Sequence, residues 1–322
     1  MSRAVLYFPI VRARRTDRIA IACSNDFVRG SALDAPDELC GLLPYCLDFV
    51  QARAIYVAGI DAGAASAAPF YYLHLRRNAR SLVSVPIEHG RLGDGAQAEP
   101  VFVFSPGRCG STLLSRILNA AGIASPSEPD FYTQMSSVLW SSPCNPLRAP
   151  YCRAMWNMSA DLCAAVGNAP VIKLRAECCR APGLFVRAPQ AKTIMMMRSF
   201  EDWAPSTARV FAPNPGKAVR KYLRAVRCHA WLAANSRCHT LVYQGLIGDT
   251  AATAAGLAHF LEAPVRTEAL RAAMAVNAQK DTPLEGRSQP GWQAKFDGIM
   301  RLWHSPRLVS ARARLGVSAL WD

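Results

Sequence analysis

The sequence has no run of about 18 uninterrupted apolar residues, the length that indicates a membrane-spanning helix, so no membrane span is expected. Its first residues, MSRAVLYFPIVRARR, place positive charge after a short apolar run, which is the reverse of a secretory leader. It also lacks internal repeats and low-complexity tracts. About half of the residues are apolar, so we expect a sizeable buried core rather than disorder.

Acidic residues are comparatively few: 23 Asp and Glu stand against 37 Lys and Arg, a formal net charge of +14. This excess favours an anionic partner, and nucleic acid, an acidic membrane or a phosphorylated cofactor would each fit. The sequence lacks zinc-finger spacing, an aromatic-rich basic strand pair and basic leucine heptads. Charge alone does not choose among nucleic acid, membrane and cofactor. Because these nucleic-acid-binding motifs are absent, no nucleic-acid partner is expected.

The eleven cysteines are odd in number and irregularly spaced. Reduced thiols in a cytoplasm are the simplest explanation. The pairs Cys228-His229 and Cys238-His239 repeat one motif, but their spacing matches no usual set of metal ligands. No metal is expected there, and whether these pairs bind anything stays open.

The chain of 322 residues is long enough for one large domain, alone or with an appendage. The segment His89–Pro100 is rich in glycine and small residues and is typical of a linker. We therefore expect an N-terminal segment or small domain of unknown role over residues 1–95 and a main domain over residues 96–322. The N-terminal segment contains three β-like runs: Arg53–Val57, Phe70–Leu75 and Ser81–Val85.

Strands and helices alternate after this linker. Strands are expected at Val101–Phe104, Pro170–Leu174, Lys192–Met197 and Thr240–Tyr243, and helices at Ser111–Ala121, from about Phe200, and at about Asp249–Leu261. This order predicts an α/β fold in which helices cover both faces of a parallel sheet. Ligands of such sheets bind at the carboxyl ends of the strands, so the functional site is expected there.

The segment VFVFSPGRCGSTLLSRIL has the form of a strand, a tight loop and a helix. Gly107 and Gly110 let the backbone turn sharply and approach a ligand. Gly110, Ser111 and Thr112 would present N–H groups at a helix N-terminus, where the helix dipole favours an anion, and Arg108 adds a permanent positive charge. The loop is interpreted as a phosphate cradle, with an ordinary Ser/Thr-capped turn as the alternative.

A nucleoside-triphosphate P-loop is a competing interpretation of this loop. That motif requires a lysine directly after its last glycine, whereas Ser111 follows Gly110 here. The strand Lys192–Met197 is followed by Arg198, and no strand ends convincingly in an aspartate that could bind magnesium. These departures argue against a triphosphatase.

Arg108-Cys109-Gly110-Ser111-Thr112 resembles the 5′-phosphosulfate loop of sulfotransferases that use 3′-phosphoadenosine 5′-phosphosulfate (PAPS), with bacterial and tyrosylprotein-type members closest in pattern. Cys109 replaces a common serine, which removes one hydroxyl but leaves the backbone donors. Arg198 and Ser206 match the family's 3′-phosphate pair in type and in their spacing of eight residues. The resemblance extends over about residues 101–290 and does not explain the first hundred residues.

The resemblance implies a P-loop, nucleotide-kinase-like three-layer fold and a sulfotransferase catalytic domain. It implies PAPS as sulfuryl donor, adenosine 3′,5′-bisphosphate as product, and no metal requirement. Lys280 lies in a segment, Asn277–Leu284, that looks like the family's late loop over the 3′-phosphate. The segment Val242–Leu246 is similar to a strand–helix unit of the family, with Gln244 in place of the usual glutamate.

Glu128 follows the loop helix at about the distance from Arg108 at which tyrosylprotein-type relatives carry a catalytic glutamate, so the resemblance implies that Glu128 is the base. Lys173 ends an apolar strand where the family has a lysine near the transferred group, and Arg175 is a second candidate. Arg108 and Lys173 would oppose the negative charge on the leaving phosphate. None of the six histidines lies where the family's histidine base would be.

The acceptor is not readable from the sequence: a small molecule or a peptide, with a hydroxyl or an amine, fits equally well. Plausible pocket walls that could equally be core are the aromatic residues Phe131, Tyr132, Trp140, Trp156 and Trp203. The oligomeric state stays open. Two other functions are retained: a magnesium-dependent kinase or nucleotide hydrolase, and a non-catalytic protein that binds RNA or other anions.

Overall fold

The structure, a computed structural model, describes residues 4–34, 41–89, 92, 99–141, 148–167, 169–280 and 282–314. The chain divides into two compact units: the first contains Met1–Phe102 and Ser115–Leu174, the second Val103–Leu114 and Arg175–Asp322. Most of the predicted linker lies outside the described residues, so the domain boundary after residue 95 stays a prediction.

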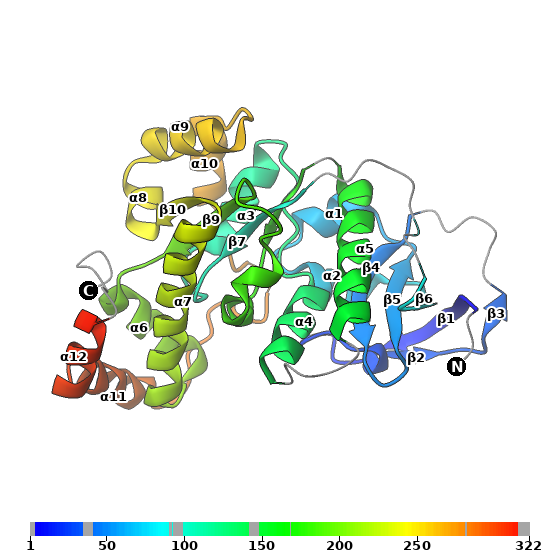
Figure 1. Cartoon of the computed structure of the whole chain (residues 1–322), viewed down its shortest axis with the longest axis horizontal. Coiled ribbons are helices and arrows are strands. Elements are labelled where there is room, and N and C mark those ends of the chain that lie inside the picture. Colours follow the sequence, from blue (N-terminus) through cyan, green and yellow to red (C-terminus); the bar gives the residue numbers. More distant parts are fainter. Residues whose placement is uncertain are drawn as a thin grey trace. The chain divides into compact units, whose positions relative to one another are not determined.

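An antiparallel sheet forms the framework of the first unit (Figure 1). Its strand order is β2-β1-β6-β5-β4, and β3 pairs with β1. β4, β5 and β6 are almost wholly buried, and helices α4 and α5 pack against β4. The bounds are β1 Leu6–Ala13, 3-10 helix η1 Ser24–Asp26, β2 Phe27–Arg29, β3 Leu33–Asp34, β4 Leu43–Asp48, β5 Arg53–Ala58, β6 Ser81–Pro86, α4 Asp130–Ser141 and α5 Arg148–Val166.

Two of the three β-like runs expected in the N-terminal segment are strands, β5 and β6, but the third prediction was wrong. Phe70–Leu75 lies mostly in helix α2 (Tyr71–Asn78), which follows the short helix α1 (Ala62–Ala67). The first residues of α2 are buried almost all round, so no polar stripe reveals the helical period. Without that stripe, a buried helix cannot be distinguished from a buried strand by its pattern.

The second sheet has four strands in the order β10-β9-β7-β8, which confirms the predicted α/β fold with a parallel sheet. β9 and β10 pair in parallel, from Lys192 opposite Arg237 to Met197 opposite Val242. β9 is buried in all but its first residue, and its last four residues are apolar, as expected for a strand covered on both faces. The bounds are β7 Val101–Phe104, β8 Val171–Lys173, β9 Lys192–Met197 and β10 Arg237–Val242.

Helices make up most of the second unit (Figure 1). α6 begins after Ser199, whose hydroxyl accepts a hydrogen bond from the amide of Asp202, and α11 packs against α6 and α7. The rings of Phe200 and Trp303 stack 3.7 Å apart at this packing. The bounds are α3 Ser111–Ala120, which is shared by both units, η2 Ala176–Arg180, η3 Pro182–Leu184, α6 Phe200–Phe211, α7 Pro215–Asn235, α8 Tyr243–Gly248, α9 Thr250–Leu261, α10 Thr267–Met274, α11 Trp292–Trp303 and α12 Pro306–Arg314.

Across the described part of the chain, no helix has both the length and the apolar character needed to cross a bilayer.

Candidate active site

The loop between β7 and α3 has an unusual backbone conformation. Gly107, Arg108 and Gly110 all have positive φ angles, of 77°, 60° and 80°. A Cβ atom added to Gly110 would lie 2.5 Å from Cδ2 of Tyr243 and 3.1 Å from Cε of Met196. Gly110 is therefore required twice, once for its backbone angle and once because there is no room for a side chain.

Side chains hold this loop from several directions. The hydroxyl of Ser105 accepts a hydrogen bond from the amide of Gly107 at 3.2 Å and donates to the hydroxyl of Ser111 at 3.3 Å. The indole Nε1 of Trp203 donates to the carbonyl of Gly107 at 2.8 Å. Trp203 is fully buried, so it is core that also supports the loop. The first N–H groups of α3, which starts at Ser111, have no partner within the helix and suit an anion.

Cys109 lies inside the loop and is completely buried. Its thiol donates a weak hydrogen bond to the carbonyl of Gly107 at 3.4 Å. Burial raises the pKa of the Cys109 thiol well above its ordinary value, more than the nearby charges of Arg198, Lys221 and Arg108 lower it. The thiol is therefore neutral at physiological pH and is a packing group rather than a nucleophile.

Two arginines and a serine from separate parts of the second unit come together beside the loop. Nε of Arg108 donates to the hydroxyl of Ser206 at 3.2 Å, although 98 residues separate them. Arg198 lies over the ring of Tyr243 at 4.6 Å, and its buried Nε has no acceptor among the described residues. Burial, and next the charge of Arg198, lower the pKa of Arg108. Like charges gathered in this way favour a bound anion.

Arg198 is held in place through its backbone and through its neighbours. Its carbonyl accepts a hydrogen bond from the hydroxyl of Tyr222 at 2.6 Å. Asp202, on the first turn of α6, bonds to the hydroxyl of Ser199 and to Nε2 of Gln244. The carboxylate of Asp202 thus has polar partners of its own.

Lys280, the third residue expected at the 3′-phosphate, lies in the turns that follow α10 and is exposed. Its amide donates to the carbonyl of Asn277 at 3.0 Å, and its ammonium group bonds to no described residue. The ammonium group of Lys280 therefore forms no hydrogen bond with the hydroxyl of Ser206, the acceptor of this cluster. Its predicted role stays a prediction.

Glu128 and Lys173, the two catalytic residues predicted beyond the loop, form an ion pair in the first unit. Nζ of Lys173 lies 2.5 Å from Oε1 of Glu128, and the two side chains are 4% and 13% exposed. The amide of Glu128 also donates to the carbonyl of Lys173 at 2.7 Å, and Glu128 has a φ of 63°. The ring of Phe70 lies under the lysine ammonium at 5.5 Å. The pair is thus ordered by backbone and side-chain contacts together.

The remaining residues noted in the sequence are Arg175 and the two Cys-His pairs. Arg175 directly precedes η2. Nε2 of His229 is 2.8 Å from the hydroxyl of Thr240, and His239 stacks on Phe260. Among the described residues, no three His, Cys, Asp or Glu side chains gather as metal ligands, and Cys228 and Cys238 are free thiols.

Two residues at the loop were not predicted as site residues. Tyr243 closes over Gly110, and Nζ of Lys221 lies 3.6 Å from where a Cβ of Gly107 would be. Tyr243 begins α8 directly after β10, at the carboxyl end of a strand, and this position could have indicated a role. Lys221 belongs to a stripe of basic residues on α7 at helical spacing, which was the available signal.

A family model described as a sulfotransferase domain matches residues 101–294, which is more than half of the chain. The chain belongs to this sulfotransferase family. The matched range contains the loop, Arg198, Ser206 and the Glu128–Lys173 pair, and it leaves the N-terminal antiparallel sheet outside. No curated protein matches the sequence.

Proposed function

We propose that this sulfotransferase takes its sulfuryl group from PAPS and transfers it to a hydroxyl or amine acceptor. The observation that carries the proposal is the cluster of Arg108, Arg198 and Ser206 beside the loop, in a member of the family. A donor with two separate phosphate groups needs two anion sites. The loop and the start of α3 suit the 5′-phosphosulfate, and Arg198 with Ser206 suits the 3′-phosphate.

The residues fit such a donor on structural grounds. The buried Nε of Arg198 has no acceptor among the described residues, and a phosphate oxygen would supply one. The missing Cβ of Gly110 lets the backbone come close to Tyr243, which leaves the loop compact. Arg108 and Arg198 lie close enough to affect each other electrostatically, and a bound phosphate would relieve their repulsion.

Glu128 is proposed as the general base. Its carboxylate accepts the acceptor's proton as the acceptor oxygen or nitrogen bonds to sulfur and the bond from sulfur to the bridging phosphate oxygen breaks. Adenosine 3′,5′-bisphosphate leaves with the electron pair. Lys173 forms an ion pair with the Glu128 carboxylate and, with Arg108, is proposed to oppose the charge that develops on the leaving phosphate. These cations and the backbone donors can provide this stabilisation without a metal.

The acceptor is a small molecule or a peptide, and nucleic acid is not expected as a partner. A cytoplasmic location is proposed because all nine described cysteines are free thiols, as in a reducing compartment.

The test is a melting experiment in EDTA with adenosine 3′,5′-bisphosphate, with 5′-AMP, which lacks the 3′-phosphate, as matched control. We expect the bisphosphate to raise the melting temperature by several degrees and 5′-AMP to have a much smaller effect. Stabilisation by ATP only in the presence of magnesium would instead identify a kinase or hydrolase. No response to either nucleotide, together with steeply salt-dependent RNA binding, would favour a non-catalytic protein.

A further inference from the structure

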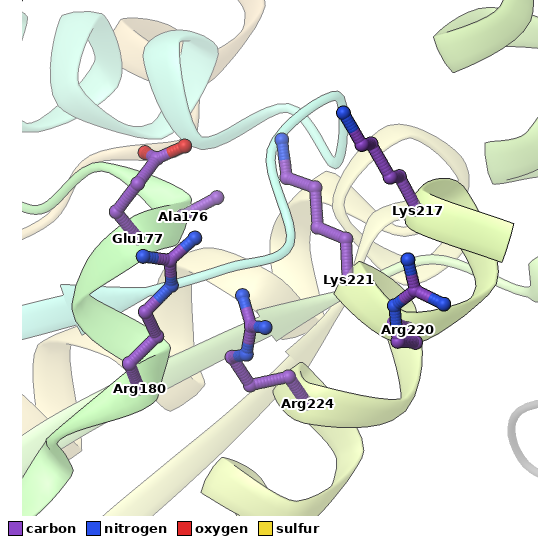
Figure 2. A pocket seen from close by; sticks show the side chains of 7 residues that line it. All are labelled: Ala176, Glu177, Arg180, Lys217, Arg220, Lys221 and Arg224. Atoms are coloured by element: carbon purple, nitrogen blue, oxygen red, sulfur yellow. The ribbon is translucent and has the colours of Figure 1, made fainter. Parts of the chain in front are cut away.

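A second basic site lies in the second unit, apart from Arg108, Arg198 and Ser206. It is a pocket of about 410 Å³, within the range of small-molecule sites. Its lining contains five cations and one carboxylate, from only two elements, η2 and α7 (Figure 2): Ala176, Glu177, Arg180, Lys217, Arg220, Lys221 and Arg224.

The spacing of the four basic residues on α7 explains how they share one face. Lys217, Arg220, Lys221 and Arg224 lie three, four and seven residues apart, which places them on one side of the helix. The opposite side buries apolar residues such as Val219 and Val226. Figure 2 shows Arg180 facing this basic side across the pocket, with Lys221 and Arg224 between it and Arg220.

The charges in this pocket are not balanced by its own residues. Glu177 is the single acidic residue in the lining. Burial, followed by the charge of Arg180, lowers the pKa of Arg224, and Arg220 acts in the same direction. Crowding of like charges costs free energy that a bound anion recovers, because each cation then gains an opposite charge.

The pocket borders the loop that we assign to the phosphosulfate. Lys221 lines the pocket, and its Nζ lies 3.6 Å from the position of a Cβ on Gly107. None of Arg108, Arg198 and Ser206 lines it. An anion in this pocket would therefore lie next to the donor's reactive end while being held by different residues.

We propose that this basic pocket binds a phosphate or sulfate group that the acceptor already carries, so that the enzyme sulfates an anionic small molecule. The inference rests on the proposed function, because only that function makes the neighbouring loop the place of sulfuryl transfer. The pocket would hold the acceptor's anionic group by charge-assisted hydrogen bonds and direct its hydroxyl or amine to the loop.

The first test measures binding of inorganic pyrophosphate by calorimetry to the full chain saturated with adenosine 3′,5′-bisphosphate, at about 0.15 M salt to limit weak surface binding. We expect one pyrophosphate site. Arg220→Gln/Arg224→Gln should weaken pyrophosphate binding about 10-fold or more, since two charge-assisted contacts are lost. The control Arg271→Gln/Arg301→Gln removes two exposed arginines outside the pocket and should change pyrophosphate affinity less than about 2-fold.

Affinity for adenosine 3′,5′-bisphosphate should be unchanged in both double variants. If Arg220→Gln/Arg224→Gln lowers the affinity for adenosine 3′,5′-bisphosphate as much as the affinity for pyrophosphate, the pocket belongs to the donor site and the proposal is overturned. Absence of pyrophosphate binding, or equal binding by wild type and pocket variant, also overturns it. Arg220→Gln alone, at an exposed position, serves if the double variant does not fold.

The second test compares transfer of labelled sulfate to matched acceptor pairs that differ only in one phosphate or sulfate group, such as glucose 6-phosphate and glucose, across a pooled panel. We expect the anionic members to be preferred about 10-fold or more, and the pocket variant to lose that preference. Preference for neutral acceptors would overturn the proposal while leaving the sulfotransferase function intact. Failure of wild type to bind adenosine 3′,5′-bisphosphate, with pyrophosphate binding retained, would instead count against the proposed donor.

Discussion

Glu128 and Lys173 in the first unit pair opposite charges with each other, whereas Arg108 and Arg198 in the second unit bring like charges together. In the first arrangement each charge has an opposite charge within the protein, and the buried lysine holds the carboxylate in one position. The second leaves a buried donor on Arg198 without an acceptor among the described residues. A closed ion pair thus suits a group that must be positioned for chemistry, and a cluster of like charges suits a group that must bind an anion.

The largest expected effect comes from removing the base of the closed pair. Glu128→Gln keeps the shape of the side chain but replaces the proton-accepting carboxylate with an amide. Turnover in a labelled-sulfate assay should fall about 10²-fold or more, with affinity for adenosine 3′,5′-bisphosphate nearly unchanged. Glu88→Gln, at an exposed position of the same unit, is the matched control and should behave as wild type.

The same change also removes the charge that faces the buried Lys173. The melting temperature of Glu128→Gln should therefore be lower than that of wild type, because an uncompensated buried charge is costly. An unchanged turnover would eliminate Glu128 as the base. Equal losses of turnover and nucleotide affinity would give it a structural role.

The next effect tests the like-charge cluster. Arg198→Ala should weaken the binding of adenosine 3′,5′-bisphosphate by about 10- to 100-fold, because charge-assisted hydrogen bonds to the 3′-phosphate are lost. Binding of 5′-AMP should scarcely change. Isothermal titration with both nucleotides measures the difference, and Arg271→Ala, an exposed arginine on α10, is the control. Equal losses for the two nucleotides would show that Arg198 does not contact the 3′-phosphate.

The sequence was informative where the site depends on neighbours along the chain. The two glycines, Arg108 and the start of α3 lie within a few residues, and their spacing predicted the loop. The order of strands and helices predicted the α/β fold, which the structure confirms. The helix α2 was mistaken for a strand because its first residues are buried almost all round, which removes the periodic polar face.

Contacts between distant segments could not be predicted in the same way. Arg108 was predicted to bind one phosphate and Ser206 the other, whereas a hydrogen bond joins the two side chains in the structure. The closure of Tyr243 over Gly110 depends on the pairing of β10 with β9, and the approach of Lys221 to Gly107 depends on the packing of α7. Such contacts follow from tertiary packing, which local spacing does not encode.

The smallest expected effect is that of Gly122→Ala, in a comparison of one glycine from each unit. Gly110 and Gly122 both have a φ of 80°, but only Gly110 has neighbours within 4 Å of an added Cβ. Gly122→Ala should lower the free energy of unfolding by about 1 kcal/mol, from backbone strain alone. Gly110→Ala should cost about 2–3 kcal/mol, since the Cβ also meets the ring of Tyr243. Denaturant titrations measure both values. Only Gly110→Ala should also weaken the binding of adenosine 3′,5′-bisphosphate. Equal effects of the two changes would mean that the loop does not depend on the close approach of Tyr243.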